Sequence, residues 1–397
     1  MKVFFFLCII FVSTSLQSKA EEKEITLWVS NGNIAKILNE IAQPFNKKYK
    51  VTISAATVDN TVEQFKTNAL GGKGPDVIVW AHDIIGTLVE SGLITSVEIS
   101  PSVRKEIFPV ALDAFTYNGK LYGYPYNFEH IALIYNKKLI KIPPKTFEEL
   151  LKVAQNFTKN DHYGFLFPVN DFYFSYPIFK AFDVYIFGPN ARDIGLNSKR
   201  AIEAATYIKS FTIPPKGSGE KTLMPIDVDY NTMMRFMITG KLAMMINGAW
   251  SLPKLQAAKI DYGIAPIPTI RGKKALPFIG SYGFYVSRMS THKILIKTFI
   301  ENYIYQDDAL IRLYKEERRA PAIKTAYNKL KDDPIYKADL EGFSNAYVEG
   351  APMPNVRTMA SVFGTMKTTL SLITRDKESV SQALNRAVDV IKKSSRN

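Results

Sequence analysis

The hydrophobic positions of the first 80 residues alternate between short apolar runs and stretches of helical spacing. Runs at residues 25–29 (ITLWV) and 51–55 (VTISA) have the length and the β-branched content of strands. The stretch between them predicts a helix with one apolar face, formed by Ile34, Leu38, Ile41 and Phe45. Pro44 lies within that helix and predicts a bend or a split. A second helix at 62–69 leads to a third apolar run at 77–80, and this βαβαβ order predicts a parallel sheet with right-handed crossovers.

The rest of the chain predicts a hairpin, further strands and a helical C-terminal part. An Asn-Gly pair at 118–119 favours a type I′ turn between two short strands. Residues 128–135 (FEHIALIY) predict one long buried strand, in which the carboxylate of Glu129 is costly unless it is paired. Thr146 and Glu149 have the spacing of a capped helix start. Further strands are predicted at 164–167, 241–247, 262–268 and 281–287, followed mainly by helix from about residue 293 to the end.

The first 20 residues predict a secretory signal peptide. Lys2 supplies a positive start, residues 3–12 are apolar, and residues 18–20 (SKA) offer a small-residue cleavage point. A membrane anchor is disfavoured, because the apolar run is well short of the roughly 20 residues that span a bilayer. The only cysteine, Cys8, lies inside this segment and too close to its start for a lipidated N-terminus. The mature chain is therefore expected to lack cysteine, which excludes thiolate metal sites and cysteine nucleophiles.

Length and charge add to this picture. A chain of 397 residues is long for a single core and suits two lobes. The formal net charge of +14 becomes +12 when removal of the signal peptide takes away Lys2 and Lys19. Such an excess is compatible with an anionic ligand, a negative membrane surface or nucleic acid. The basic residues are spread along the chain, however, and the dense cluster at 315–319 (KEERR) is mixed in sign, so we expect a generally basic surface and no nucleic-acid partner.

Candidate chemistry begins where the third strand ends. A turn rich in glycine and proline at 71–76 leads into the apolar run, and the segment closes with Trp80, Ala81, His82 and Asp83. Ligands of open α/β sheets bind just beyond the carboxyl ends of such strands. A flat aromatic ring beside a carboxylate suits a sugar, which has an apolar face and a rim of hydroxyl groups.

Carboxylates recur beside aromatic side chains elsewhere in the chain. Glu129 follows Phe128, and Asp171 precedes Phe172 and Tyr173. Two carboxylates that face a sugar could act as the acid and the base of a glycosidase. They could equally accept hydrogen bonds from sugar hydroxyls, each worth roughly 1.5–3 kcal/mol. We favour binding because the aromatic residues are as prominent as the acids, although any single aromatic residue is more often part of a core.

Common enzyme signatures are absent from the sequence. It has no Gly-x-Ser-x-Gly elbow, no pair of zinc-binding histidines on a helix and no phosphate loop ending in Gly-Lys-Ser or Gly-Lys-Thr. The four histidines are too scattered for a metal site: His82, His130, His162 and His292. No metal or cofactor is therefore predicted.

Taken in order, these segments resemble the maltose- and maltodextrin-binding proteins of bacterial ABC importers, a family of extracellular solute-binding proteins. The resemblance covers nearly the whole mature chain. It rests on residues 74–83 (GPDVIVWAHD), 117–121 (YNGKL), 124–125 (YP) with Glu129, 133–137 (LIYNK), 144–149 (PKTFEE), 245–250 (MINGAW) and 353–356 (MPNV). Any one of these motifs is weak, whereas the series is specific.

The resemblance implies an α/β periplasmic-binding-protein fold of two lobes, with a hinge and a ligand cleft between them. The first lobe would comprise residues 21–128 and 285–333, and the second residues 129–284 and 334–397. The chain would cross between the lobes near 127–129, 279–281 and 333–335. The resemblance further implies a monomeric receptor, not an enzyme, which binds maltose or a maltodextrin in the periplasm and delivers it to the permease subunits of an ABC transporter in the inner membrane.

Carried over position by position, the resemblance also implies a set of site residues. The stacking aromatic positions of the family fall on Trp80, Tyr173, Trp250 and Phe363. Its hydroxyl-binding acids fall on Asp83, Glu129 and Asp171, with Glu63 as an addition. Ala81 and Met353 would also line the cleft.

The sequence departs from the family pattern at several of its ligand contacts. An acid and a lysine near the first strand are replaced by residues 30–33 (SNGN), and an arginine after the loop acid is replaced by Ile84. The last tryptophan becomes Phe363, and the arginine beyond it becomes Lys367. Hydroxyl contacts are thus expected to be lost mainly from one lobe, which allows a sugar of different register, length or identity.

Three alternatives to a maltodextrin receptor stay open. The first is a receptor of the same fold for another oligosaccharide, for example an anionic one, which the net charge favours. The second is a secreted carbohydrate-active enzyme that uses Glu129 and Asp171. The third is a basic structural or nucleic-acid-binding protein.

Overall fold

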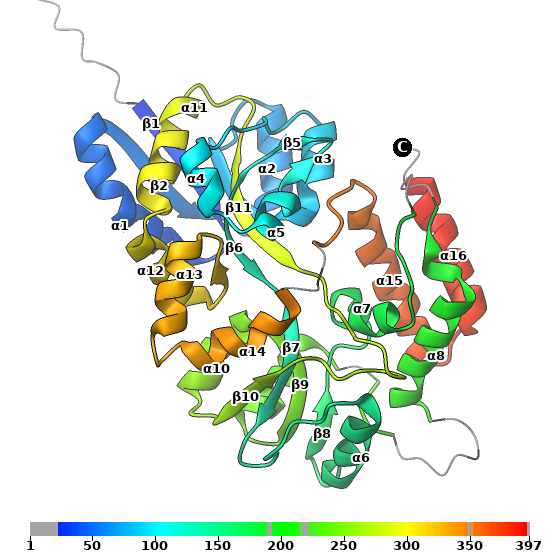
Figure 1. Ribbon diagram of the computed structural model, residues 1–397. Helices are drawn as coiled ribbons and strands as arrows, with labels where there is room; N and C mark the ends of the chain where they lie inside the picture. Colours follow the sequence, from blue (N-terminus) through cyan, green and yellow to red (C-terminus); the bar gives the residue numbers. More distant parts are fainter. Residues whose placement is uncertain are drawn as a thin grey trace, which may run out of the picture.

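The computed structural model describes residues 23–188, 193–214, 217, 222–226, 228–347, 350 and 352–394. The predicted signal peptide, residues 1–20, lies outside them. Two α/β lobes stand one above the other in Figure 1, and β6 and β11 run from the upper lobe toward the lower one. Each lobe has its own sheet, one of six strands and one of four. Within the described residues, no helix has the length and the apolar content needed to cross a membrane.

The first lobe is built on the six-stranded sheet, with the order β12-β6-β11-β3-β1-β2. Its first three strands in the sequence are parallel, as predicted: β1 (Lys23–Val29), β2 (Val51–Thr57) and β3 (Val77–Ala81). β11 (Gly280–Val286) lies antiparallel between β3 and β6 (Tyr124–Glu129), and the short β12 (Ala320–Pro321) forms one edge. The sheet is therefore mixed, because strands from later in the chain extend the parallel unit.

The helices of the first lobe come from distant parts of the sequence. They are α1 (Gly32–Tyr49), α2 (Thr61–Leu70), α3 (Ile85–Glu90), α4 (Pro101–Glu106), α5 (Pro109–Ala114), α11 (Lys293–Phe299), α12 (Asp307–Glu317) and α13 (Lys324–Asp332). Pro44 does not split α1, which runs on for five more residues. The adjacent Phe45 is buried and packs edge-on against Phe299 and Tyr303, so tertiary contacts hold this last turn of the helix.

The second lobe is built on the four-stranded sheet, with the order β10-β7-β9-β8. β7 (Ile131–Asn136) is antiparallel to β10 (Tyr262–Ala265) and to β9 (Leu242–Gly248), whereas β8 (Tyr163–Leu166) is parallel to β9. The helices around it are α6 (Phe147–Phe157), α7 (Phe172–Ala181), α8 (Lys199–Thr212), α9 (Tyr230–Ile238), α10 (Leu252–Ala257), α15 (Met359–Thr374) and α16 (Val380–Ser394).

Two local predictions are confirmed. The hairpin of β4 (Thr116–Tyr117) and β5 (Lys120–Leu121) turns at Asn118 and Gly119, whose φ angles of 48° and 75° are those of a type I′ turn. Thr146 caps α6, because its hydroxyl accepts a hydrogen bond from the Glu149 backbone N–H at 3.1 Å.

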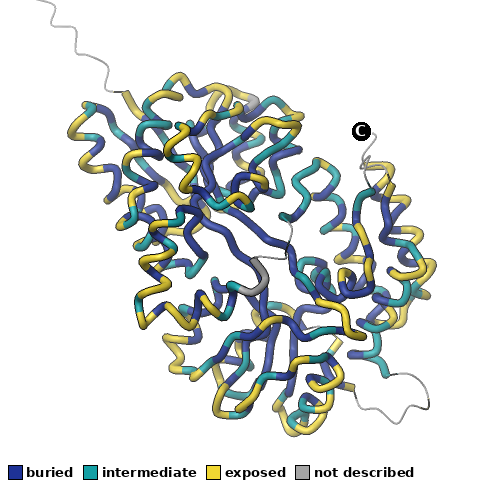
Figure 2. The backbone as a smooth tube through the Cα atoms, viewed as in Figure 1, coloured by how far each residue is buried: buried dark blue, intermediate teal, exposed yellow. Residues whose placement is uncertain are grey.

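Two separate hydrophobic cores divide the molecule, and Figure 2 shows buried chain inside each lobe. The first core takes residues from 25–128 and 279–340, and the second takes residues from 131–278 and 343–391. α14 (Lys337–Tyr347) contributes to both, with Leu340 in the first core and Phe343 in the second. We therefore propose that the first lobe also includes residues 280–284 and 334–340, in addition to those expected from the sequence.

The prediction of one long strand over residues 128–135 is wrong. β6 ends at Glu129 in the first sheet, and β7 begins at Ile131 in the second. His130 is buried between them, with its ring nitrogens 2.8 Å and 2.5 Å from the backbone oxygens of Ile131 and Phe343. The apolar pattern did not reveal the break, because the strand on either side of it is buried.

Candidate functional site

A cleft of about 550 Å³ lies between the two lobes, within the 300–1,000 Å³ range of typical small-molecule sites. The first lobe lines it with Trp80, Ala81, Asp83, Gly280, Tyr282 and Arg319. The second lobe lines it with Asp171, Phe172, Tyr173, Trp250, Met353, Phe363, Gly364 and Lys367. Glu129 lies where the chain first crosses between the lobes. The site thus depends on the packing of both lobes.

Aromatic rings form one wall of the cleft. Trp250 follows β9 in the short helix η3 (Ala249–Ser251), and its ring folds back over Gly248. A Cβ atom at position 248 would lie 2.0 Å from that ring, so only glycine permits this approach. Tyr173 lies in the first turn of α7, with its ring centroid 6.2 Å from that of Trp250. Phe363 extends the wall from α15.

Two polar atoms of the cleft residues lack a partner. Asp83 lies in η1 (His82–Ile84), just beyond the carboxyl end of β3, and its Oδ1 is buried without a hydrogen bond to any described residue. The same holds for the hydroxyl of Tyr173. Burial raises the pKa of Asp83 to about 6. Because buried polar groups are almost always hydrogen-bonded, these two atoms are candidates for hydrogen bonds to a polar ligand in the cleft.

Asp171 both caps a helix and lines the cleft. It is the N-cap of α7, where its carboxylate accepts a hydrogen bond from the Tyr173 backbone N–H at 3.0 Å. It also lines the cleft near Lys367. Burial raises the pKa of Asp171, and the backbone hydrogen bonds and the Lys367 charge oppose this rise.

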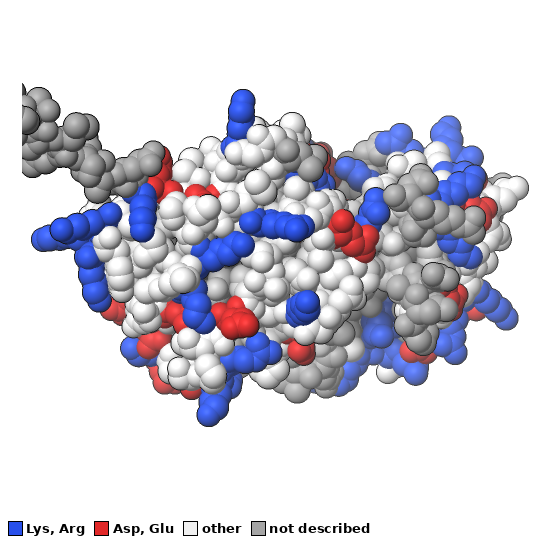
Figure 3. Space-filling view, turned by 90° about the horizontal axis from the view of Figure 1, so that it is seen from above, with Lys and Arg blue, Asp and Glu red and all other residues white. Residues whose placement is uncertain are grey.

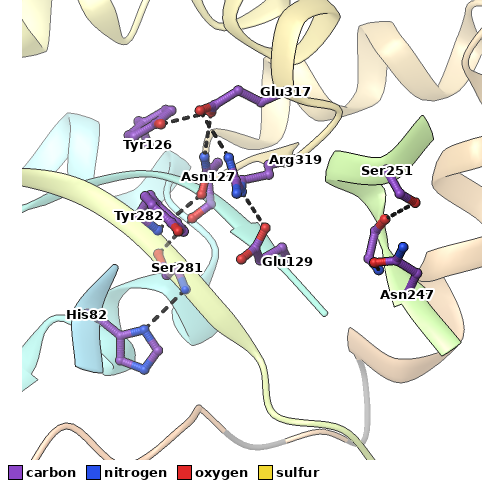
Figure 4. A network of polar contacts seen from close by, with 11 residues as sticks. His82, Tyr126, Asn127, Glu129, Asn247, Ser251, Ser281, Tyr282, Glu317 and Arg319 are labelled. Carbon is purple, nitrogen blue, oxygen red and sulfur yellow. Dashed lines mark hydrogen bonds and ion pairs between the residues drawn. The ribbon is translucent and has the colours of Figure 1, made fainter. Parts of the chain in front are cut away.

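A network of buried polar groups forms the floor of the cleft (Figure 4). Arg319 pairs through Nε with Glu129 and through Nη1 with Glu317, at 3.0 Å for the latter. Glu317 also accepts hydrogen bonds from the Tyr126 hydroxyl at 2.9 Å and from Asn127 Nδ2 at 3.4 Å. The carboxylate of Glu129, anomalous inside an apolar stretch of sequence, is thus compensated by an arginine from a distant part of the chain.

His82 connects the same network to the second lobe. Its Nδ1 accepts a hydrogen bond from the Ser281 backbone N–H at 3.2 Å, which leaves Nε2 to donate to the Met353 backbone oxygen at 2.8 Å. Ser281 in turn donates from its hydroxyl to the Asn127 backbone oxygen at 2.7 Å. Burial lowers the pKa of His82 to about 4, so the ring is neutral at pH 7. His82 therefore has a structural role, although its neighbours Ala81 and Asp83 line the cleft.

The structure gathers nearly all of the predicted site residues. Those that line the cleft are Trp80, Ala81, Asp83, Glu129, Asp171, Tyr173, Trp250, Met353 and Phe363. Glu63 does not. It lies on α2 with its side chain 73% exposed and pairs with Lys66 one turn away at 2.9 Å. Its side chain thus points to solvent in this structure, and a ligand contact of Glu63 stays a prediction.

The sequence analysis missed Tyr282 and Arg319. Tyr282 is the one residue of β11 that is not fully buried, and its neighbours on both sides are buried, so no period-two pattern marks it in the sequence. Arg319 belongs to the mixed-sign cluster 315–319, which was expected on the surface, yet Glu317 and Arg319 are largely buried. The sequence contains no signal for this, because Glu129, the partner of Arg319, lies 190 residues away.

Surface charge and metal-binding potential add little to the site. On the face shown in Figure 3, Lys and Arg side chains are scattered, with Asp and Glu side chains between them. Among the described residues, no group of three or more His, Cys, Asp or Glu side chains could hold a metal ion. The distinctive chemistry of the described residues is therefore in the cleft.

The sequence matches the model of the bacterial extracellular solute-binding proteins over residues 40–340, and the chain belongs to this family. Two relatives are similar over most of the chain. The maltodextrin-binding protein MdxE of Bacillus subtilis is 31% identical over 370 residues, covering 89% of this chain and 86% of that protein. The maltotriose-binding protein of Pyrococcus abyssi is 30% identical over 315 residues, covering 77% of this chain and 67% of that protein.

A solved structure agrees with this assignment. The cyclo/maltodextrin-binding protein complexed with maltotetraose matches with a TM-score of 0.80 and 30% identity, covering 95% of this chain and 98% of that one. The family resemblance and the two-lobe α/β fold predicted from the sequence are thus confirmed.

Proposed function

We propose that this protein is a receptor that binds maltose or a longer maltodextrin in the interlobe cleft and delivers it to an ABC importer. One observation carries the proposal: aromatic rings and carboxylates from both lobes line the same cleft. Rings can stack on the apolar faces of glucose units, and carboxylates can accept hydrogen bonds from their hydroxyls. The relatives named for maltodextrin and maltotriose binding support the same ligand class.

In the proposed mechanism, the sugar first rests on the second lobe and then draws the first lobe over it. Trp250 and Tyr173 provide the stacking surface of the second lobe. Trp80 and the unpaired oxygen of Asp83 approach from the first lobe. The ligand drives closure only through contacts that it makes better in the closed state, and these first-lobe contacts are the candidates.

The charges of the cleft favour a neutral sugar over an anionic one. Three carboxylates line it. The guanidinium of Arg319 is already shared between Glu129 and Glu317, which leaves Lys367 as the other cation of the lining. A ligand carboxylate would therefore face mainly charges of its own sign. The excess of positive charge belongs to the rest of the chain.

A glycosidase has less support from the geometry. Burial raises the pKa of both Glu129 and Asp171, as a general acid requires. Both carboxylates are already engaged within the protein, however: Glu129 accepts from Arg319, and Asp171 accepts from the Tyr173 backbone N–H at the start of α7. Prolonged incubation with maltodextrins is expected to release no reducing sugar, and release proportional to protein concentration would instead support the enzyme.

The proteins of this family are extracellular. For this chain we propose the periplasm as the location and the permease subunits of an ABC importer as the partner. The signal peptide would be cleaved after residue 20 and the mature protein released into the periplasm. There it would act as a monomer, and its closed lobes would present the surface that the permease subunits of the importer recognise.

Isothermal titration of the mature protein with maltose, maltotriose and longer maltodextrins tests the proposal. Dissociation constants of about micromolar or tighter are expected. Absence of heat with every maltodextrin, from protein shown to be folded by circular dichroism, would contradict it. Galactosyl and uronic-acid oligosaccharides in the same panel separate a receptor of another specificity from no sugar receptor at all.

A further inference from the structure

Arg319 is the least expected residue of the cleft. It lies in the turn between α12 and β12, and only 14% of its side chain is exposed. Its guanidinium lies 4.4 Å from the ring centroid of Tyr282 and 5.8 Å from that of Trp250. It thus belongs to the first lobe and touches an aromatic residue of the second.

Each nitrogen of the Arg319 guanidinium has a distinct environment. Nε pairs with Glu129, and Nη1 pairs with Glu317. Nη2 has no hydrogen-bond partner among the described residues, and it is not among their fully buried atoms. Because Arg319 lines the cleft, this amino group is placed to donate to a ligand.

Among the described residues of the first lobe, Arg319 is the one cation that lines the cleft or the cavity beside it. A small cavity of about 260 Å³ adjoins the cleft and shares Tyr282 and Arg319 with it. Ser30 and Asn31 line that cavity and carry no charge. Arg319 therefore supplies the positive charge that the first lobe brings to the site.

Glu129 depends on this charge. It is buried, and burial raises its pKa while Arg319 opposes the rise. The titratable groups that face Glu129 are Arg319 and Glu317 from the α12 side, Tyr282 from β11 and Tyr173 from α7, with Asp83 and Asp171 in the same cleft lining. Arg319 is the cation that acts on Glu129, and Lys367, which lies near Asp171, is the other cation of the cleft lining. Without it, burial and the neighbouring Glu317 would raise the pKa of Glu129 further.

We propose that Arg319 is a ligand-recognition and positioning residue of the sugar site, which donates to the sugar from Nη2 and holds Glu129 ionised and oriented to accept a sugar hydroxyl. This inference rests on the proposed function. Because Arg319 keeps Glu129 ionised, we expect the affinity for the sugar not to change with pH above the range in which Asp83 titrates.

The experiment is a pH series of maltotriose titrations with the wild type, R319Q, R319K and the double variant R319Q/E129Q. Between about pH 8.5 and about pH 6.5 we expect the wild type and R319K to lose less than about twofold in affinity, and R319Q to lose about tenfold as Glu129 becomes protonated. We expect R319Q/E129Q to bind weakly at every pH. It lacks the carboxylate at position 129, and because glutamine does not titrate, its affinity should not change with pH. Surface variant R312Q, on the helix α12 that precedes this turn, is the matched control and should behave as the wild type, because neither Arg312 nor its ion-pair partner Glu40 lines the cleft.

The outcomes distinguish a failure of the proposed function from a failure of the role proposed for Arg319. Wild-type protein that binds no sugar refutes the proposed function. Wild-type protein that binds, together with R319Q of the same affinity and the same pH profile, refutes the role of Arg319. If R319Q does not fold, the double variant R319Q/E317Q replaces it. This variant also removes the buried carboxylate of Glu317, so that only Glu129 is left without its cation, and we expect the same pH-dependent loss of affinity.

Discussion

At the scale of single residues, substitution of Trp250 tests whether this side chain binds the ligand or belongs to the core. Its ring is partly exposed in the cleft and packs over Gly248, where a Cβ atom would collide with it. We expect Trp250→Ala to weaken maltodextrin binding by about 1–3 kcal/mol, and to change the melting temperature of the unliganded protein little. Gly248→Ala should also weaken binding, because it displaces the ring. Calorimetric titration and thermal melts test both, and a W250A protein that unfolds would mean that Trp250 belongs to the core.

Asp83 predicts a conflict between binding and stability. Its pKa is raised by burial from 3.8 to about 6, so the folded state holds the proton more tightly than the unfolded state. The free energy of unfolding therefore falls as the pH rises from about 4 to about 6 and stays lower above that. We expect Asp83→Asn to stabilise the unliganded protein at pH 7 by about 1–3 kcal/mol and to weaken sugar binding. Denaturant unfolding at pH 5 and pH 7 measures this, and a variant less stable than the wild type at pH 7 would contradict it.

At the scale of secondary-structure elements, α7 reaches the cleft through its cap. Asp171 both accepts from the Tyr173 N–H and lines the cleft. Asp171→Ser keeps a capping oxygen and removes the charge, whereas Asp171→Ala removes both. We expect both variants to weaken sugar binding, but only the alanine variant to lose about 1 kcal/mol of stability. Equal stability of the two would show that the cap contributes nothing measurable to α7.

The segments that pass between the lobes are pinned by His82, which bonds to Ser281 and to Met353. Its pKa is lowered by burial to about 4, so the folded state binds the proton less tightly than the unfolded state. The stability from neutral His82 is complete above about pH 6.5 and is lost as the pH falls toward 4, opposite in sign to Asp83. We expect His82→Gln to be less stable at pH 7 by about 1–3 kcal/mol and to have a shallower acid limb. Thermal melts from pH 4 to pH 8 give both quantities, and an unchanged acid limb would assign that limb to other groups.

At the scale of the whole molecule, two cores that meet at a cleft predict a hinge motion. Contacts from both lobes surround the ligand position, whereas each lobe has a sheet and a core of its own. We expect saturating maltotriose to reduce the radius of gyration in solution scattering and to raise the melting temperature. Trp250→Ala at the same sugar concentration is the control and should show a smaller change. A radius that stays constant while the sugar is bound would contradict closure.

The sequence by itself determined much about this protein, because the relevant signals are local. Apolar periodicity located β1 to β3 and the helices between them, and the Asn-Gly turn fixed the hairpin at 118–119. The motif that ends in Trp80 and Asp83 marked one side of the cleft, since the carboxyl end of a parallel strand is a ligand position whatever surrounds it. Family motifs supplied the aromatic positions of the other side.

Tertiary structure decided the features that join distant segments. Whether residues 128–135 form one strand or two depends on which sheet each half pairs with, and apolar residues look the same in both. Whether Glu63 faces the ligand or solvent depends on how α2 packs. The burial of Arg319 depends on a carboxylate 190 residues earlier, and no local pattern records that pairing. The sequence therefore specified most of the elements and the cleft residues that lie in family motifs. The pairing of Arg319 with Glu129 and Glu317 exists only in the folded chain, because it joins residues that are far apart in the sequence.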